Sequence, residues 1–149
     1  LCEFLAEGDG PVLVLDTAAH PWLASDVAAK TLASREVVVA GRLATALASA
    51  AVLVLPTASW AETEGTYTSS TGRVQLARRA FPPRAQALPA WQLLHLLGQR
   101  LEVIAAGDTS PRQLFEDLTA EVPGFAGMTA RRVQSEPGLP VLEEVADVG

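Results

Sequence analysis

The chain has 149 residues, 49% of them hydrophobic, and a net charge of −6 at pH 7. This length allows one sizeable core, and the deficit of positive charge argues against nucleic-acid binding, which needs a basic surface. Its apolar runs are too short for a membrane span. A single cysteine and two histidines disfavour a metal or iron–sulfur site built from this chain alone. Residues 1–4 lack an initiator Met and a signal-peptide pattern, so we expect a piece of a longer protein.

The first part of the chain alternates between apolar runs and amphipathic stretches. The runs at residues 11–16, 36–40 and 52–55 predict strands, and the Val and Leu residues without alternation at 52–55 are typical of a strand buried on both faces. Residues 21–34 and 43–49 predict helices between them. Strand, helix, strand, helix, strand is the pattern of an α/β fold with a parallel sheet, right-handed crossovers and flanking helices.

The second part predicts helices. Residues 78–88 contain two prolines in sequence and are expected to run extended over the surface. One helix is expected from Pro89, and another from Thr109 or Ser110, either of which can cap a helix that has Pro111 at its first position. We therefore expect one domain over residues 1–133, with the alternation at 11–56, a loop at 57–77, the surface stretch at 78–88, helices at 89–130, and a loosely ordered tail at 134–149.

The loop after the third expected strand carries the most patterned polar residues. Loops at the carboxyl ends of parallel strands are where α/β sheets place binding residues. Glu62 and Glu64 could act as an acid and a base, but two carboxylates this close in a loop are more often structural, and Arg73 is a natural partner for either. Gly65 is expected to allow a backbone conformation or a close approach that a side chain would block.

The two histidines have ordinary explanations. His20 comes between an expected strand and Pro21, which favours a role in a turn over a role as a ligand. His95 lies between leucines in an expected helix, which favours a partly buried or interface position. No nucleophile elbow and no phosphate-binding loop of the Walker type is present in the sequence.

Residues 51–75 resemble a segment of the molybdopterin oxidoreductases. The family pattern reads Ala-Asp-Val-Val-Leu-Pro, then Glu-x-x-Gly-Thr-(Phe/Tyr)-x-Asn, then x-Glu-Gly-Arg-x-Gln. This chain matches it with the strand that ends at Pro56, with Glu62 followed by the residues Gly65, Thr66 and Tyr67, and with Gly72, Arg73 and Gln75. The similarity extends over roughly residues 11–133. Within the superfamily, the chain is most similar to the large iron–sulfur subunit of NADH-quinone oxidoreductase, respiratory complex I.

Three departures from the family pattern favour that subunit. Val52 stands where the pattern has Asp, Ser69 where it has Asn, and Thr71 where it has Glu. A large polyanionic cofactor needs many fixed hydrogen-bond donors, so a loss of polar groups suggests that the cofactor was given up. We therefore interpret six residues as a vestigial site and expect no catalytic or metal-binding residue in the chain. The six are Glu62, Gly65, Thr66, Gly72, Arg73 and Gln75.

The resemblance implies a structural, non-catalytic part of the peripheral arm of complex I, which carries electrons from NADH to quinone coupled to ion translocation. It implies no cofactor in this chain, [2Fe–2S] and [4Fe–4S] clusters elsewhere in the subunit, and FMN in the complex. The implied partners are other peripheral-arm subunits, on the cytoplasmic side of the bacterial inner membrane, without membrane insertion. Two alternatives stay open: a fragment of an active molybdopterin enzyme such as a formate dehydrogenase catalytic subunit, and a free-standing α/β binding module.

Overall fold

The computed structural model describes residues 10–16 and 26–141. The chain divides into two compact units, the first made of residues 1–59 and 83–96 and the second of residues 60–82 and 97–149. The expectations for His20, for the first residues of the helix at 21–34 and for the tail beyond residue 141 lie outside the described residues.

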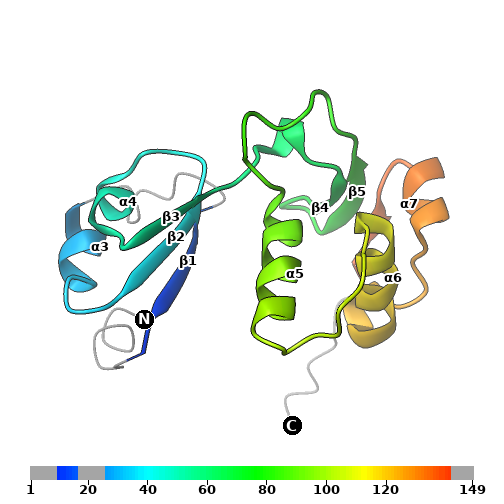
Figure 1. Ribbon diagram of the computed structural model, residues 1–149. Coiled ribbons are helices and arrows are strands. Elements are labelled where there is room, and N and C mark those ends of the chain that lie inside the picture. Colours follow the sequence, from blue (N-terminus) through cyan, green and yellow to red (C-terminus); the bar gives the residue numbers. More distant parts are fainter. Residues whose placement is uncertain (1–9, 17–25, 142–149) are drawn as a thin grey trace, which may run out of the picture. The chain divides into compact units, whose positions relative to one another are not determined.

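A parallel sheet forms the first unit (Figure 1). Its strands lie in the order β1-β2-β3 and are joined by two short helices. Val14 of β1 lies beside Val39 of β2, which lies beside Val54 of β3. The α/β fold with a parallel sheet and flanking helices is thereby confirmed. The elements are β1 (Val12–Asp16), α3 (Asp26–Thr31), β2 (Val37–Gly41), α4 (Ala46–Ala50) and β3 (Leu53–Pro56).

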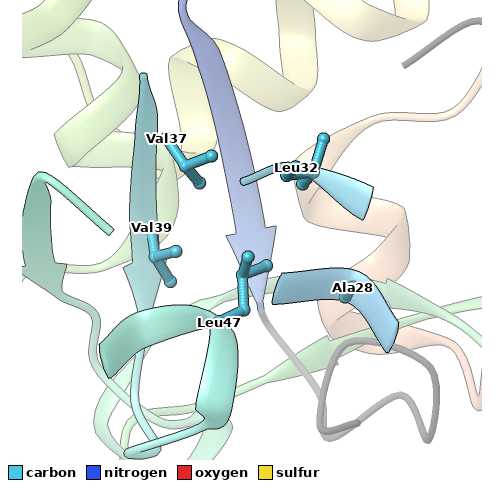
Figure 2. Packing of buried hydrophobic residues seen from close by; sticks show 5 residues of the cluster. All are labelled: Ala28, Leu32, Val37, Val39 and Leu47. Atoms are coloured by element: carbon cyan, nitrogen blue, oxygen red, sulfur yellow. The ribbon is translucent and has the colours of Figure 1, made fainter. Parts of the chain in front are cut away.

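Both helices pack on the same face of this sheet. Ala28 of α3, Leu32 just after it and Leu47 of α4 meet Val37 and Val39 of β2 in one cluster (Figure 2). Each of these five side chains is at most 3% exposed. Successive residues of a strand face opposite sides, so the odd-numbered residues of β2 line the helix side.

The expected burial of the third strand on both faces is wrong for this chain. Leu53 is 50% exposed and Val54 45% exposed, and Leu13 of β1 is 38% exposed. Leu13 and Leu53 lie on the face opposite α3 and α4, whereas Val54, in register with Val39 on the helix side, is exposed because β3 is an edge strand. Strands of this composition are normally covered on both faces. Among the described residues, α3 and α4 cover one face of this sheet, and Leu13 and Leu53 on the other face stay exposed.

The second unit combines a small antiparallel sheet with helices (Figure 1). Its strands lie in the order β4-β5-β6. Only a loop was expected at 57–77, and the β4–β5 hairpin is a correction to that expectation: β4 has four residues and little apolar content, although Val74 and Leu76 of β5 do alternate with polar residues. The elements are η1 (Trp60–Glu62), β4 (Gly65–Thr68), β5 (Arg73–Ala77), α6 (Pro111–Glu121), η2 (Pro123–Phe125), α7 (Ala130–Ser135) and β6 (Leu139–Pro140).

The helix expectations for the second part are confirmed. Helix α5 (Ala90–Arg100) begins one residue after Pro89. Helix α6 begins at Pro111, and the hydroxyl of Ser110 accepts a hydrogen bond from the Gln113 N–H at 3.2 Å, which selects Ser110 over Thr109 as the cap. Residues 78–88 contain no helix or strand and are mostly exposed, as expected. Ordered elements extend further than expected, because α7 and β6 continue into the region assigned to the tail.

A second core holds this unit together. It joins β5 and β6 to α6, α7 and the segment between the helices. All of its fully buried members are at most 5% exposed. This core fixes the β4–β5 hairpin against α6 and α7, and the hairpin carries most of the candidate site residues. The members are Val74, Phe115, Met128, Val133 and Leu139.

Candidate functional site

All six candidate residues lie in the second unit, but they do not converge on one point. Thr66 pairs with Leu76, and Tyr67 pairs with Gln75, across the β4–β5 hairpin. Neighbouring residues of a strand face opposite sides. Thr66 and Gln75 therefore lie on opposite faces of the hairpin. Glu62 lies outside it, in η1, where it is 8% exposed.

The turn of the hairpin uses its own polar groups. The Ser69 N–H donates to the Arg73 carbonyl and the Gly72 N–H donates to the Ser69 carbonyl, both at 2.9 Å. The hydroxyls of Ser69 and Thr71 lie 2.8 Å apart, and the Arg73 N–H donates to the Ser69 hydroxyl at 3.2 Å. Gly72 has φ +70°, a conformation that suits glycine. Two of the three departures from the family pattern are thus polar residues that close this turn.

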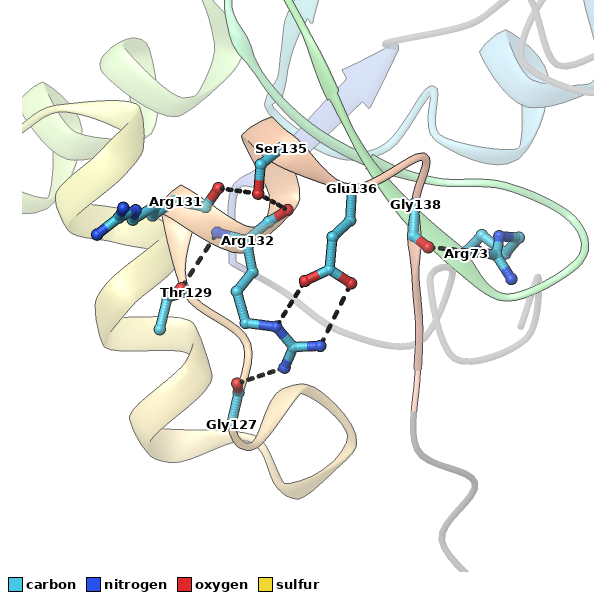
Figure 3. A network of polar contacts seen from close by, with 8 residues as sticks. All are labelled: Arg73, Gly127, Thr129, Arg131, Arg132, Ser135, Glu136 and Gly138. Carbon is cyan, nitrogen blue, oxygen red and sulfur yellow. Dashed lines mark hydrogen bonds and ion pairs between the residues drawn. The ribbon is translucent and has the colours of Figure 1, made fainter.

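Arg73 does not pair with Glu62 or Glu64, so that expectation is wrong. Its guanidinium donates to the carbonyl of Gly138, just before β6 (Figure 3). The main chain joins the same segments, since the Val141 N–H donates to the Gly72 carbonyl at 2.8 Å. Arg73 therefore ties β5 to the segment that leads into β6.

The close approach expected at Gly65 is absent among the described residues. A Cβ placed on Gly65 would meet no atom within 4 Å. Close approach occurs instead at Gly138, where a Cβ would lie 3.1 Å from Gln75 Cγ and 3.2 Å from Arg73 Nε. Gly138 also has φ +105°. No local pattern marks Gly138, because the residues that approach it come from the distant strand β5.

A cavity of about 460 Å³ opens beside Gly65 and Thr66. Phe115 and Val133, both nearly buried, contribute apolar surface to it. Three arginines from separate parts of the chain also line it: Arg78 just after β5, Arg112 in the first turn of α6 and Arg131 in α7. The other lining residues are Glu64, Leu76, Pro111, Ala130 and Gln134.

The charge of this cavity is mostly positive. Arg112 is paired with Glu116 at 2.9 Å, and Glu64 is the one acidic residue in the lining. A guanidinium is a planar donor suited to carboxylate and phosphate groups. The cavity can therefore hold an anionic group. The cavity could not be predicted from the sequence, because Arg78, Arg112 and Arg131 lie far apart in the chain and belong to no common motif.

Arg132 of α7 forms an ion pair with Glu136 at the C-terminal end of the helix (Figure 3). The Arg132 Nε donates to Glu136 Oε1 at 2.9 Å, and the same guanidinium donates to the Gly127 carbonyl at 3.2 Å. The hydrogen bond from Arg132, together with its charge, lowers the pKa of Glu136. Thr129 caps α7, since its hydroxyl accepts from the Arg132 N–H at 3.2 Å.

Metal chemistry and membrane insertion receive no direct support from the described part of the chain. Within residues 10–16 and 26–141, no three His, Cys, Asp or Glu residues are grouped so that they could hold a metal ion. The helices of those same segments are also too short or too polar to cross a bilayer. His95 lies in α5 and is half-buried, as expected.

The fold and the sequence comparisons together define the family. A parallel sheet with flanking helices is followed by a polar hairpin, in the order that the resemblance implies. Residues 20–100, more than half of the chain, match the family model for molybdopterin oxidoreductase. The chain belongs to the molybdopterin oxidoreductase family.

Its relatives include formate dehydrogenases. The F420-dependent formate dehydrogenase 2 subunit alpha of Methanococcus maripaludis is 32% identical over 115 residues, which are 67% of this chain and 17% of the relative. The F420-dependent formate dehydrogenase subunit alpha of Methanocaldococcus jannaschii is 36% identical over 94 residues, 60% of this chain and 14% of the relative. The NADPH-Fe(3+) oxidoreductase subunit alpha of Geobacter sulfurreducens is 33% identical over 95 residues, 60% of this chain and 11% of the relative. The chain thus spans less than a fifth of the length of these relatives.

Proposed function

We propose that this chain is a segment of the alpha subunit of a formate-dehydrogenase-type molybdopterin oxidoreductase. The observation that carries the proposal is its identity of 32% and 36% to two formate dehydrogenase alpha subunits. The sequence pattern alone favoured complex I, with a formate dehydrogenase catalytic subunit as an alternative. These relatives favour the alternative, and the polar turn formed by Ser69 and Thr71 weakens the argument that the departures mark a lost cofactor.

Within that enzyme, the role proposed for this segment is structural. The turn donors of Ser69, Gly72 and Arg73 are satisfied inside the unit, and Glu62 and Gln75 lie away from the cavity. A pterin dinucleotide would need many free donors at one place, so the described residues do not fit its complete site. The molybdenum cofactor and any [2Fe–2S] or [4Fe–4S] clusters would be held by other parts of the protein. The arginine-lined cavity is the place where this segment would contact an anionic group.

The proposal is tested on the purified full-length protein. Metal analysis is expected to find stoichiometric molybdenum together with iron, and formate is expected to reduce an artificial electron acceptor. Iron without molybdenum, combined with NADH-dependent quinone reduction by a complex that contains the protein, would contradict the proposal and favour the complex I interpretation. A matched preparation from cells grown with tungstate in place of molybdate controls for adventitious metal.

A second candidate is supported by the Geobacter relative, whose name assigns it NADPH-dependent Fe(3+) reduction. The same preparation distinguishes the two, because NADPH would then replace formate as the electron donor. For either enzyme, we propose that the partners are further subunits of the oxidoreductase. The location expected from the complex I resemblance, on the cytoplasmic side of the inner membrane, is tested by fractionation with and without a salt wash.

A further inference from the structure

The arginine-lined cavity of the second unit combines an apolar floor with charged side chains. Phe115 is 4% exposed and Val133 is 3% exposed, so these two side chains form a buried floor. Leu76 and Pro111 add half-buried apolar surface. The three arginines and Glu64 are exposed. An occupant would therefore meet apolar groups at the base of the cavity and charged groups at its edge.

Two of the three arginines have no partner within the described part of the chain. The guanidiniums of Arg78 and Arg131 form no hydrogen bond or ion pair there. Figure 3 shows the side chain of Arg131 pointing away from the ion pair of α7. Arg112 does pair with Glu116, but the two side chains are 75% and 44% exposed, and an exposed pair of this kind is weak. All three arginines can therefore donate to a ligand.

The charge of the lining favours a phosphate group. Three positive charges and the one negative charge of Glu64 leave the lining with a formal charge of +2, and Glu116 lies outside it. A carboxylate would neutralise only one of these charges, whereas a phosphate monoester carries about −1.5 to −2 at pH 7. Its three terminal oxygens also suit several guanidinium donors at once. A phosphate monoester therefore matches the lining in charge and in hydrogen bonding.

The size and the floor of the cavity favour a ligand with an apolar body. The volume of about 460 Å³ lies within the range of small-molecule sites. A bare phosphate ion would contact the arginines and leave the floor formed by Phe115 and Val133 uncovered. An apolar body that covers this floor adds binding free energy in proportion to the apolar area that it removes from water.

We propose that the arginine-lined cavity binds a small phosphate monoester with an apolar body. The phosphate accepts hydrogen bonds from Arg78, Arg112 and Arg131, and the apolar body lies against Phe115 and Val133. Every residue of this site belongs to the second unit. The inference rests on the proposal that this cavity contacts an anionic group, and it is independent of which electron donor the enzyme uses.

Binding of phenyl phosphate to the purified full-length protein tests the inference. Phenyl phosphate has both the charged group and the apolar body, phenylacetate replaces the phosphate by a carboxylate, and inorganic phosphate lacks the body. Isothermal titration calorimetry gives the dissociation constant of each probe. Phenyl phosphate is expected to bind at least about tenfold more tightly than either of the others. Equal affinity for inorganic phosphate or for phenylacetate would overturn the inference.

Substitutions at the exposed arginines locate the binding site. Arg78→Gln and Arg131→Gln each remove one charge from the lining, and each is expected to weaken the binding of phenyl phosphate about tenfold. Arg79→Gln is the matched control, because Arg79 is also exposed but lies outside the lining. Its effect is expected to stay within about twofold, since solvent and salt screen its charge. Unchanged affinity in both Arg78→Gln and Arg131→Gln would contradict the proposed site.

Two further results would overturn the inference. The first is no measurable binding of phenyl phosphate, which would mean that another part of the full-length protein or a partner fills the cavity. The second is loss of molybdenum from Arg78→Gln and Arg131→Gln, which would mean that these arginines hold the resident cofactor. Molybdenum content and formate oxidation are measured in the same preparations, so the proposed enzyme can fail while the phosphate site is confirmed, and the reverse.

Discussion

The guanidinium of Arg73 donates to the carbonyl of Gly138, so a side chain of β5 holds the segment that leads into β6. Sixty-five residues separate the two in the chain. Gly138 accepts this contact in a left-handed backbone conformation, with φ +105°. The pair closes the small antiparallel sheet at the end where the β4–β5 turn lies, which explains why Arg73 is unavailable to the acidic residues of the preceding loop.

Gly138→Ala is expected to open the β5–β6 pairing. The new Cβ would adopt an unfavourable φ and would lie 3.2 Å from Arg73 Nε and 3.1 Å from Gln75 Cγ. Strain of this kind costs about 1–3 kcal/mol. Hydrogen exchange of the Val141 amide, which donates to Gly72, measures the loss as a lower free energy of local opening. Gly65→Ala, where a Cβ has open space, is the control and should leave this amide unchanged.

Ser110→Ala is expected to fray the first turn of α6. The substitution removes the hydroxyl that accepts from the Gln113 N–H, and loss of such a cap costs about 0.5–2 kcal/mol. Exchange of the α6 amides should therefore become faster. Ser110→Asp keeps an oxygen acceptor at the cap and should exchange like the original protein. If Ser110→Ala and Ser110→Asp exchanged equally fast, the cap would have no role in stability.

Leu47→Ala is expected to loosen the first unit. Leu47 is 2% exposed and packs with Leu32 and Val39 between the helices and the sheet. Removing a buried leucine side chain costs about 2–5 kcal/mol, depending on how far the site collapses. The opening free energy of the β2 amides should fall by that amount. Leu43→Ala, at a position 42% exposed, is the matched control and should cost about 0.5 kcal/mol or less.

The ion pair of α7 predicts a pH dependence with a definite sign. The hydrogen bond and charge of Arg132 lower the pKa of Glu136, so the folded state favours the ionised carboxylate. The ion pair stabilises the folded state fully at pH values above the pKa that Glu136 has in the unfolded chain. This stabilisation is lost as the pH falls through the lower pKa that Glu136 has in the folded protein. An NMR titration of the Glu136 carboxyl carbon should give a midpoint below the ordinary glutamate value.

Arg132→Gln is the matched comparison for this titration. It removes the charge that lowers the pKa of Glu136, so the midpoint should rise toward the ordinary value. Added salt should move the midpoint in the same direction, because the pair is exposed and screened by solvent. Identical midpoints in the original protein and the variant would show that the pair does not form in solution.

Several features follow from local patterns, and the sequence predicted them. The three strands and two helices of the first unit came from the alternation of apolar runs with amphipathic stretches, because burial in a strand or helix imposes its own period on the chain. The start of α6 came from Pro111 with Thr109 or Ser110 before it, which act within one turn, and the structure selected Ser110 as the cap. The family resemblance in residues 51–75 is also a local pattern, and the family match over residues 20–100 confirms it.

Other features depend on residues that are distant in the chain. The β4–β5 hairpin has short strands, and Val74 and Leu76 of β5 pack in the core that α6 and α7 help to form. The partner of Arg73 is set by β6, and the cavity beside Gly65 unites arginines from three separate parts of the chain. The spacing of residues along the chain gives no information about such long-range contacts.

The sequence by itself thus determined the parallel sheet, the start of α6 and the membership of the molybdopterin oxidoreductases, because each depends on neighbours within one turn, one strand or one motif. Only the tertiary structure decided where the six candidate residues point and which sheet face is covered. Those properties depend on strand order and on the side of the sheet that each crossover takes. The apolar run of β3 predicted a buried strand. The positions of α3 and α4 show that they cover the sheet face of Val37 and Val39 and leave the opposite face exposed.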